Sequence, residues 1–304
     1  MGLLSTGATL QFSTYISLVF TTLFWGGTFI AGRALAGHVT PASSAFIRFA
    51  IATIALFFFT LAHEKKIAIP PRQKWLPLFF LGLTGVFSYN VFFFTGLQYI
   101  SAGRASLIIA LNPLAITIGA FIWMREPLNY KQIFGVLLSL VGAIFVISNG
   151  HPQEIFSASF GKGELALLGC VMSWVLYSLI GGTVLKVLSP LVSVFYSSLI
   201  GTILLFPLAL HQGLLSGLTN TKLEDWFSLF YLGFFGTALG FTLYYRAIKQ
   251  IGATRSGVFI NLVPLFAIIL SWFILGESVK GIVVIGGIIL LSGVSITNYC
   301  RSSK

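Results

Sequence analysis

The sequence predicts an all-α integral membrane protein whose ten transmembrane helices form two inverted five-helix repeats. Hydrophobic residues make up 57% of the 304 positions and charged residues only 8%, a composition that excludes a water-soluble globular domain. Long uncharged apolar stretches recur along the chain, and a helix needs about 20 such residues to cross a hydrocarbon core roughly 30 Å thick. The third observation is that the second half of the sequence repeats the first.

The apolar stretches predict ten membrane-spanning helices. They cover residues 12–32, 44–62, 75–95, 102–124, 131–148, 163–182, 190–211, 226–246, 254–274 and 281–299. A closed β-barrel would show short segments of alternating apolar residues rather than continuous runs such as 131–148. The first helix is not followed by a small-residue cleavage site in a polar context, so we interpret it as a retained helix rather than a signal peptide.

The repeat keeps a constant register over long blocks of sequence. Matching residues in 75–142 recur 151 positions later in 226–293, and an upstream block in 25–57 recurs 149 positions later in 174–206. The matched pairs include Trp75 and Trp226, Gly82 and Gly233, Arg104 and Arg255, Pro113 and Pro264, and Glu126 and Glu277. The slip of two residues between the blocks lies in a loop, so both halves carry the same helical plan.

The repeat predicts two domains, residues 12–148 and residues 163–299, with five helices in each. Because five crossings is an odd number, the second repeat enters the membrane from the opposite side and the two repeats are inverted. Inverted repeats of similar energy can exchange conformations and open a central site to each side in turn. Duplication retained for packing alone is the alternative interpretation.

The net charge of +11 would suggest nucleic-acid binding in a soluble protein, but here the basic residues lie between the helices. With the N-terminus in the cytoplasm, 12 Lys and Arg residues face the cytoplasm and 5 lie in outer loops, the outer ones being Arg33, Arg104, Lys162, Lys222 and Lys280. This asymmetry follows the positive-inside rule. We expect a multi-pass protein of the cell's inner (plasma) membrane, with both termini cytoplasmic and no nucleic-acid partner.

The first half of the chain contains several short motifs in an order that the second half repeats. They are Phe24-Trp25-Gly26, Pro41 followed by Arg48-Phe49, Ser101 to Ser106 leading to Asn112-Pro113, and Arg125-Glu126-Pro127. With these motifs and their second-half counterparts, the chain resembles the drug/metabolite transporter superfamily, specifically its ten-helix EamA-type members. The resemblance spans nearly the whole chain. It implies a central substrate pathway and, usually, export of amino acids or related small metabolites.

The first and sixth helices each carry a deep tryptophan with a polar residue one turn later. Trp25 and Thr28 share a face of the first helix, and their counterparts Trp174 and Tyr177 share a face of the sixth. Both tryptophans lie deeper than residues of an interfacial aromatic belt. We expect these four residues to line a central substrate pathway, with core packing as the alternative.

The second, third and eighth helices supply further candidates. Arg48 in the second helix, about one turn from its start, has no basic counterpart because Ser197 occupies the matching position. This asymmetry suggests binding of an anionic group or closure of an outer gate. Tyr89 and Asn90 of the third helix and Tyr244 of the eighth are additional pathway candidates.

The fourth and ninth helices carry prolines near their middle. Pro113 and Pro264 would leave the carbonyls of Ile109 and Ile260 without their usual hydrogen bonds, which the bilayer tolerates only beside protein or water. We therefore expect these helices to line the pathway, unless the prolines only kink them. Intramembrane amides lie beside them, Asn112 and Asn261.

Two matched arginines begin the fourth and ninth helices. Arg104 and Arg255 could extend their charges to the lipid headgroups, which is the default interpretation, or could gate the two mouths of the pathway. Glu126 and Glu277 lie at the membrane surface, where they would stabilise the N-termini of the fifth and tenth helices.

The acidic residues and histidines all lie in loops or at helix ends, so coupling through an intramembrane carboxylate is not expected. The chain carries no nucleophile elbow, zinc-binding His pair or paired membrane aspartates, and we expect no enzyme activity, metal or cofactor. The predicted function is transport, and more specifically export, of small metabolites such as amino acids. The alternative is a membrane channel or scaffold without alternating access. The expected partners are a small-molecule substrate and the lipid bilayer, and both monomer and homodimer remain open.

Overall fold

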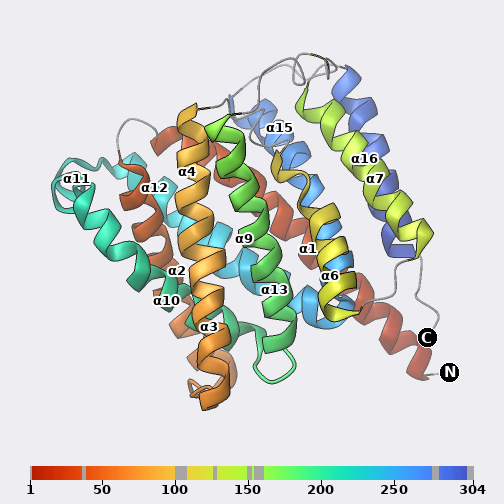
Figure 1. Cartoon of the computed structure of the whole chain (residues 1–304), viewed down its shortest axis with the longest axis horizontal. Coiled ribbons are helices and arrows are strands. Elements are labelled where there is room, and N and C mark those ends of the chain that lie inside the picture. Colours follow the sequence, from red (N-terminus) through yellow and green to blue (C-terminus); the bar gives the residue numbers. More distant parts are fainter. Residues whose placement is uncertain are drawn as a thin grey trace.

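The computed structural model describes residues 2–35, 39–99, 108–125, 129–148, 153, 161–275 and 281–299, and the secondary structure in these residues is entirely helical (Figure 1). Eight helical segments are long and apolar enough to cross a membrane. Two shorter apolar helices, Asn112–Met124 and Tyr130–Phe145, occupy the two remaining expected positions. The ten-helix fold expected from the sequence is confirmed.

The first half contains five crossings. α1 (Gly2–Leu35) and α2 (Pro41–Glu64) are continuous, and the short η1 (Arg72–Lys74) leads into the third crossing. That crossing consists of α3 (Trp75–Leu81), η2 (Gly82–Ser88) and α4 (Tyr89–Tyr99). The described parts of the fourth and fifth crossings are α6 (Asn112–Met124) and α7 (Tyr130–Ile147).

The second half repeats this plan. α9 (Lys162–Val184) and α10 (Pro190–His211) are followed by the short additional helix α11 (Leu214–Asn220). The eighth crossing consists of α12 (Leu223–Tyr231), η3 (Leu232–Leu239) and α13 (Gly240–Ile251). The ninth consists of α14 (Ala253–Gly257), η4 (Val258–Asn261) and α15 (Leu262–Leu275), and α16 (Gly281–Tyr299) is the tenth.

The second helices of the two halves begin in the same way. In α2 the Thr40 side chain accepts a hydrogen bond from the Ser43 amide, and in α10 the Ser189 side chain accepts one from the Val192 amide. A proline, Pro41 or Pro190, follows each cap directly. An N-cap hydroxyl and a proline in the first turn both favour helix initiation, so the repeat extends to the residues that start the helices.

The contacts between helices follow a pseudo-two-fold arrangement. α1 packs against α13 and α15, whereas its counterpart α9 packs against α4 and α6. The remaining matched helices pair with each other, α2 with α10 and α7 with α16, and the α7–α16 pair forms one edge of the bundle (Figure 1). These exchanged contacts are those of two inverted repeats related by an axis in the membrane plane.

Glycine allows the α7–α16 pair to approach at the level of the backbone. A Cβ atom added at Gly142 would lie 2.3 Å from the Leu290 amide nitrogen, and one added at Gly293 would lie 2.3 Å from the Ser139 amide nitrogen. Small residues at helix contacts in membranes permit such close packing. The two outermost helices of the halves therefore form a tight unit.

The third and eighth crossings both contain a π-helical segment at matched positions. η2 covers Gly82–Ser88 and η3 covers Leu232–Leu239, so that Gly82 and its counterpart Gly233 both lie at the start of a segment. A π-helical segment is rare and often occurs at a functional site, because it changes the direction of the side chains that follow it. Tyr89 follows η2 directly, and Gly240 occupies the same place after η3.

Candidate functional site

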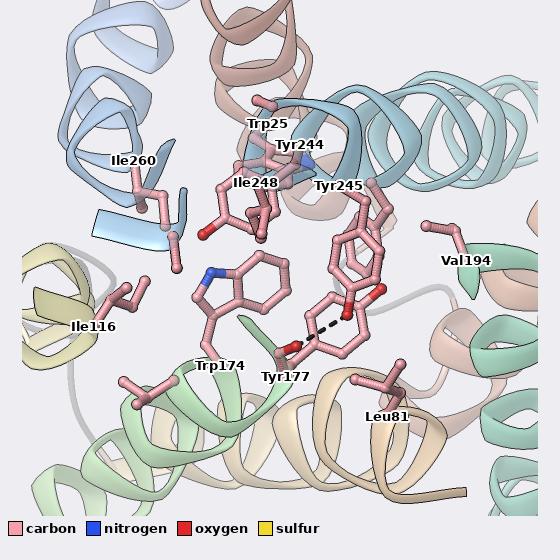
Figure 2. Close-up of a cluster of buried hydrophobic side chains, with 14 of the residues drawn as sticks. Trp25, Leu81, Ile116, Trp174, Tyr177, Val194, Tyr244, Tyr245, Ile248 and Ile260 are labelled. Carbon is pink, nitrogen blue, oxygen red and sulfur yellow. Dashed lines mark hydrogen bonds between the residues drawn. The ribbon is translucent and has the colours of Figure 1, made fainter. Parts of the chain in front are cut away.

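Five aromatic side chains meet where α1, α9 and α13 pack together. They form what we term the aromatic centre, which consists of Trp25, Trp174, Tyr177, Phe241 and Tyr244. Figure 2 labels four of them, Trp25, Trp174, Tyr177 and Tyr244. The two indole rings meet edge to face, with centroids 5.4 Å apart and planes at 84°. The Tyr244 ring lies 5.4 Å from Trp25 and 5.7 Å from Trp174. Because each half contributes one tryptophan, the aromatic centre lies at the interface between the halves.

Tyr177 and Tyr245 close one side of the aromatic centre. Their rings lie 4.8 Å apart, and the Tyr245 hydroxyl donates a 2.9 Å hydrogen bond to the Tyr177 carbonyl (Figure 2). Both side chains are fully buried. The ring of Tyr177 lies directly over Gly85, where an added Cβ atom would be 2.1 Å from the ring. Glycine in the π-helical segment η2 thus makes room for this tyrosine.

The two tryptophans differ in their hydrogen bonds. The indole N–H of Trp25 donates to the Gly236 carbonyl at 2.8 Å, whereas the buried indole nitrogen of Trp174 has no hydrogen-bond partner of ordinary geometry among the described residues. The buried hydroxyl of Tyr177 also makes no hydrogen bond of ordinary geometry among the described residues, but the side chains of Ser197 and Tyr245 interact with it. The Tyr244 side chain interacts in the same way with the indole of Trp174, so both polar groups lie among neighbouring hydroxyl groups, where buried polar groups are usually placed.

Arg48 lies beside the aromatic centre and deeper in the membrane than the sequence predicted. α2 begins at Pro41, which places Arg48 two turns, or about 10 Å, along the helix rather than one turn. Its Nε donates to the Thr237 hydroxyl of η3 at 3.0 Å, and its guanidinium carbon lies 5.1 Å from the centre of the Phe49 ring. The guanidinium is also close enough to the Tyr89 hydroxyl to interact with it electrostatically.

The structure brings together five of the nine residues expected to line a substrate pathway. Trp25, Trp174, Tyr177 and Tyr244 belong to the aromatic centre, and the ring of Tyr89 lies 5.5 Å from that of Trp174. Thr28 lies next to this group, because a Cβ atom added at Gly236 would contact its methyl group at 2.6 Å. The hydroxyl of Thr28 donates to its own helix, at the carbonyl of Trp25.

The three asparagines are placed differently. The amide of Asn90 donates to the carbonyl of Val86 in its own crossing, away from the ring of the neighbouring Tyr89. Asn261 is fully buried and donates to the Ser139 hydroxyl of α7 at 2.9 Å, so it links the ninth crossing to the fifth. Asn112 is buried at the start of α6, and its side-chain oxygen has no partner among the described residues.

Both prolines lie where the helical hydrogen bonding within a crossing changes, and Pro264 lies near the middle of the span Ala253–Ile274 as expected. Pro113 occupies the first turn of α6, after a turn at residues 110–111. Pro264 occupies the first turn of α15, after the 3₁₀ segment η4. The Ile260 carbonyl, expected to be free, faces the amide of Leu262. Proline is favoured in a first helical turn because its missing N–H has no partner to lose there.

Of the two arginines expected to gate the pathway, only Arg255 lies among the described residues. Arg255 lies in the short α14 and is partly exposed, whereas Arg104 lies outside the described residues, as do Glu126 and Glu277. Among the described residues, no three His, Cys, Asp or Glu side chains gather as metal ligands would.

Sequence reasoning missed three residues of this region. Phe241 lies 5.3 Å from Trp174, Tyr245 closes the buried side, and Thr237 holds Arg48. One usable signal was the placement of Phe241, Tyr244 and Tyr245 within five residues on one helix, where the first and second lie on one face. The π-helical segments leave no such signal in the sequence.

Comparison with known proteins agrees with this architecture. The uncharacterized transporter YyaM of Bacillus subtilis is 31% identical over 280 residues, 92% of each chain. The "Probable terminal-alkyne amino-acid exporter" of Streptantibioticus cattleyicolor is 27% identical over 284 residues, 93% of this chain and 92% of its own. One solved crystal structure shares the fold, with a TM-score of 0.75 at 19% identity, over 96% of this chain and 99% of that chain.

The EamA-like transporter family matches the chain twice, at residues 12–148 and at residues 161–299. Both matches together cover all ten helices. The chain is therefore a multi-pass integral membrane protein that belongs to the EamA-like transporter family, a family of transporters and not of enzymes.

Proposed function

We propose that this protein exports small metabolites, with amino acids as the leading class, by alternating access between domains 12–148 and 163–299. The observation that carries the proposal is the aromatic centre, which both halves build and which holds two buried polar groups that make no hydrogen bond of ordinary geometry among the described residues. A relative named as an amino-acid exporter, 27% identical, supports the substrate class. The distribution of basic residues supports cytoplasmic termini, and hence a pathway whose ends face the cytoplasm and the outside.

The aromatic centre suits a substrate with a neutral or zwitterionic body. Aromatic faces bind apolar groups by burial and bind ammonium groups through their quadrupole. Among the described residues, the carboxylates serve as helix caps or surface contacts. Glu164 accepts from the Gly161 amide, Asp225 accepts from the Lys222 amide, and Glu64 accepts from the Ser189 hydroxyl.

These assignments support transport that is not coupled through a buried carboxylate. In proteoliposomes with equal substrate on both sides, we expect an imposed pH gradient to drive no net flux. Net substrate movement that follows the pH gradient alone would refute this part of the proposal.

The substrate can be found by comparing the metabolites secreted by cells with and without the protein, followed by counterflow of each candidate in proteoliposomes. We expect Trp174→Ala to reduce counterflow at least about tenfold, because it removes the ring that contacts five neighbouring aromatic side chains. Trp272→Ala is the matched control, since Trp272 is 50% exposed on the surface of α15. Full activity of Trp174→Ala at equal membrane abundance would place the pathway elsewhere.

A channel or a scaffold without alternating access is the competing function. Single cysteines at Asn112 and Asn261, tested with membrane-impermeant thiol reagents from each side, separate the three mechanisms. In a transporter, accessibility of these positions alternates when substrate is added to one side. Simultaneous access from both sides would indicate a channel, and no access from either side would indicate a scaffold.

A further inference from the structure

The side chain of Arg48 is the one described cation that lies well inside a membrane-spanning helix. The other described Lys and Arg residues lie at or near helix ends or in loops. A guanidinium at this depth is costly unless it pairs with an anion, a carbonyl or water. None of the described carboxylates forms an ion pair with Arg48, so within the described chain the positive charge has no counter-anion.

The Thr237 hydroxyl fixes the direction of the guanidinium. It donates to the Leu232 carbonyl at 2.9 Å, five residues earlier in η3, and accepts from Arg48 Nε at 3.0 Å. Because the hydroxyl proton is already used within the π-helical segment, only the oxygen is free to accept. The contact occupies Nε and leaves the two terminal nitrogens of Arg48, which lie in one plane and match the two oxygens of a carboxylate.

The guanidinium is connected to the aromatic centre on two sides. It lies over the ring of Phe49, which is 6.1 Å from the ring of Phe241. It also interacts electrostatically with Tyr89, whose ring contacts Trp174. Arg48 and Tyr89 both keep partly exposed surface, although protein surrounds them. A molecule bound here would contact the cation and the aromatic rings together.

The second half shows that the scaffold does not need this cation. The counterpart of Arg48 is Ser197 and that of Thr237 is Val86, and α10 packs against η2 just as α2 packs against η3. The same helix contact thus forms without the polar pair. Arg48 and Thr237 occur together in one half and are absent together from the other, as expected of two residues with a joint role.

We propose that Arg48 binds a single carboxylate group of the substrate, with Thr237 as its positioning residue and the aromatic centre holding an apolar body. This inference rests on the proposed function as a transporter and names its substrate class. One cation balances one negative charge, so a phosphate dianion would leave a negative charge unpaired in the membrane. An amino group on the substrate would be accepted by the faces of Trp174 and Tyr244.

Binding of matched acids and amides tests the proposal. The probes are 4-methylpentanoate, 3-phenylpropanoate and L-leucine, each compared with its carboxamide, and phenylphosphonate serves as the dianion. Binding to the purified protein is followed by tryptophan fluorescence. We expect at least one acid to bind about tenfold more tightly than its amide, as loss of a charged hydrogen-bond pair implies, and phenylphosphonate to bind more weakly than that acid.

Four variants give the test its controls. Arg48→Gln should bring the ratio of acid to amide affinity close to one, and Arg48→Lys and Thr237→Val should each lower it several-fold. Trp272→Ala, on the exposed surface of α15, should leave it unchanged. If Arg48→Gln elutes as an aggregate, the ratios of acid to amide affinity measured for Arg48→Lys and Thr237→Val test the proposal in its place.

Three results would overturn the proposal. They are equal binding of acid and amide by the unmodified protein, no binding of any of the three acids, and a ratio that the Arg48 and Thr237 variants do not change. Counterflow in proteoliposomes separates this failure from that of the proposed function. Arg48-dependent acid binding without movement of the bound acid would refute transport, whereas movement of substrates with no dependence on Arg48 would refute the carboxylate site.

Discussion

The two sides of the aromatic centre occupy matching positions of the two repeats but differ in chemistry. The arginine side comprises Thr28, Arg48 and Thr237, and the tyrosine side comprises their counterparts Tyr177, Ser197 and Val86. Arg48 and Thr28 keep partly exposed surface, whereas Tyr177 and Ser197 are fully buried. One side is therefore polar and partly open, and the other is closed by an aromatic ring.

The two sides differ in which helix of the repeat carries the larger residue. On the tyrosine side, the first helix of the repeat carries the large residue and the second helix carries a serine. On the arginine side, the first helix carries a threonine and the second carries the long arginine. The glycines beside them, Gly85 and Gly236, are the same in both halves. An inverted repeat thus keeps its backbone contacts and still gives its two ends different functions.

Shortening the residue that the first helix of each repeat contributes, Tyr177 or Thr28, should give the largest difference in unfolding free energy between the two sides. We expect Tyr177→Ala to lower the free energy of unfolding by about 3–5 kcal/mol, because it empties a fully buried aromatic site. Thr28→Ala should cost about 1 kcal/mol or less, since it removes a hydrogen bond within one helix. Denaturant titration of both variants in detergent measures the difference, and equal losses would show that the sides contribute equally to packing.

Adding a methyl group at the two matched glycines gives a smaller contrast. Gly85→Ala would place a Cβ atom 2.1 Å from the Tyr177 ring, and we expect overpacking to cost about 1–3 kcal/mol. Gly236→Ala would place a Cβ atom 2.6 Å from the methyl group of Thr28, a smaller side chain that is partly exposed, so we expect a smaller loss. Gly32→Ala, with no atom within 4 Å, is the control. A larger loss for Gly236→Ala than for Gly85→Ala in the same titration would reverse the assignment of the crowded side.

Replacing each tryptophan by phenylalanine should give the smallest effect. Trp25→Phe loses the hydrogen bond to the Gly236 carbonyl, which corresponds to about 1 kcal/mol of unfolding free energy. Trp174→Phe loses only a weaker contact with the Tyr244 side chain, because its indole nitrogen makes no hydrogen bond of ordinary geometry among the described residues. Thermal unfolding of the two variants measures the difference. A cost for Trp174→Phe equal to that for Trp25→Phe would show that the contact of Trp174 with Tyr244 is as strong as the hydrogen bond of Trp25 to Gly236.

The fold was largely predictable because its determinants are properties of the sequence itself. The length of each apolar stretch sets the number of crossings, the constant register reveals the repeat, and the odd number of crossings in each repeat sets the inversion. Helix starts were less accurate, since α2 begins three residues before the expected helix and Arg48 consequently lies one turn deeper. A cap such as Thr40 followed by Pro41 was the local signal for that start.

Residues of the candidate site could be predicted from the sequence only where they lie deep in a helix and also have a matched counterpart in the other repeat. Trp25 and Trp174 were identified because they are matched and deep, and the structure places them in contact. Phe241 could not be chosen from 30 phenylalanines, since most of these lie against lipid or in the core. Thr237 could not be linked to Arg48, because their contact depends on a change in backbone hydrogen bonding that residue types do not encode.

The π-helical segments also carry information about history. Each of these segments holds more residues per turn than an α-helix, yet the offset of 151 positions is the same before η2, at Trp75 and Trp226, and after it, at Pro113 and Pro264. A residue gained by one copy alone would have shifted this offset by one. The widened turn was therefore present in the ancestral five-helix unit before it was duplicated, and the residues that differ between the two sides were acquired on a backbone that was already bent.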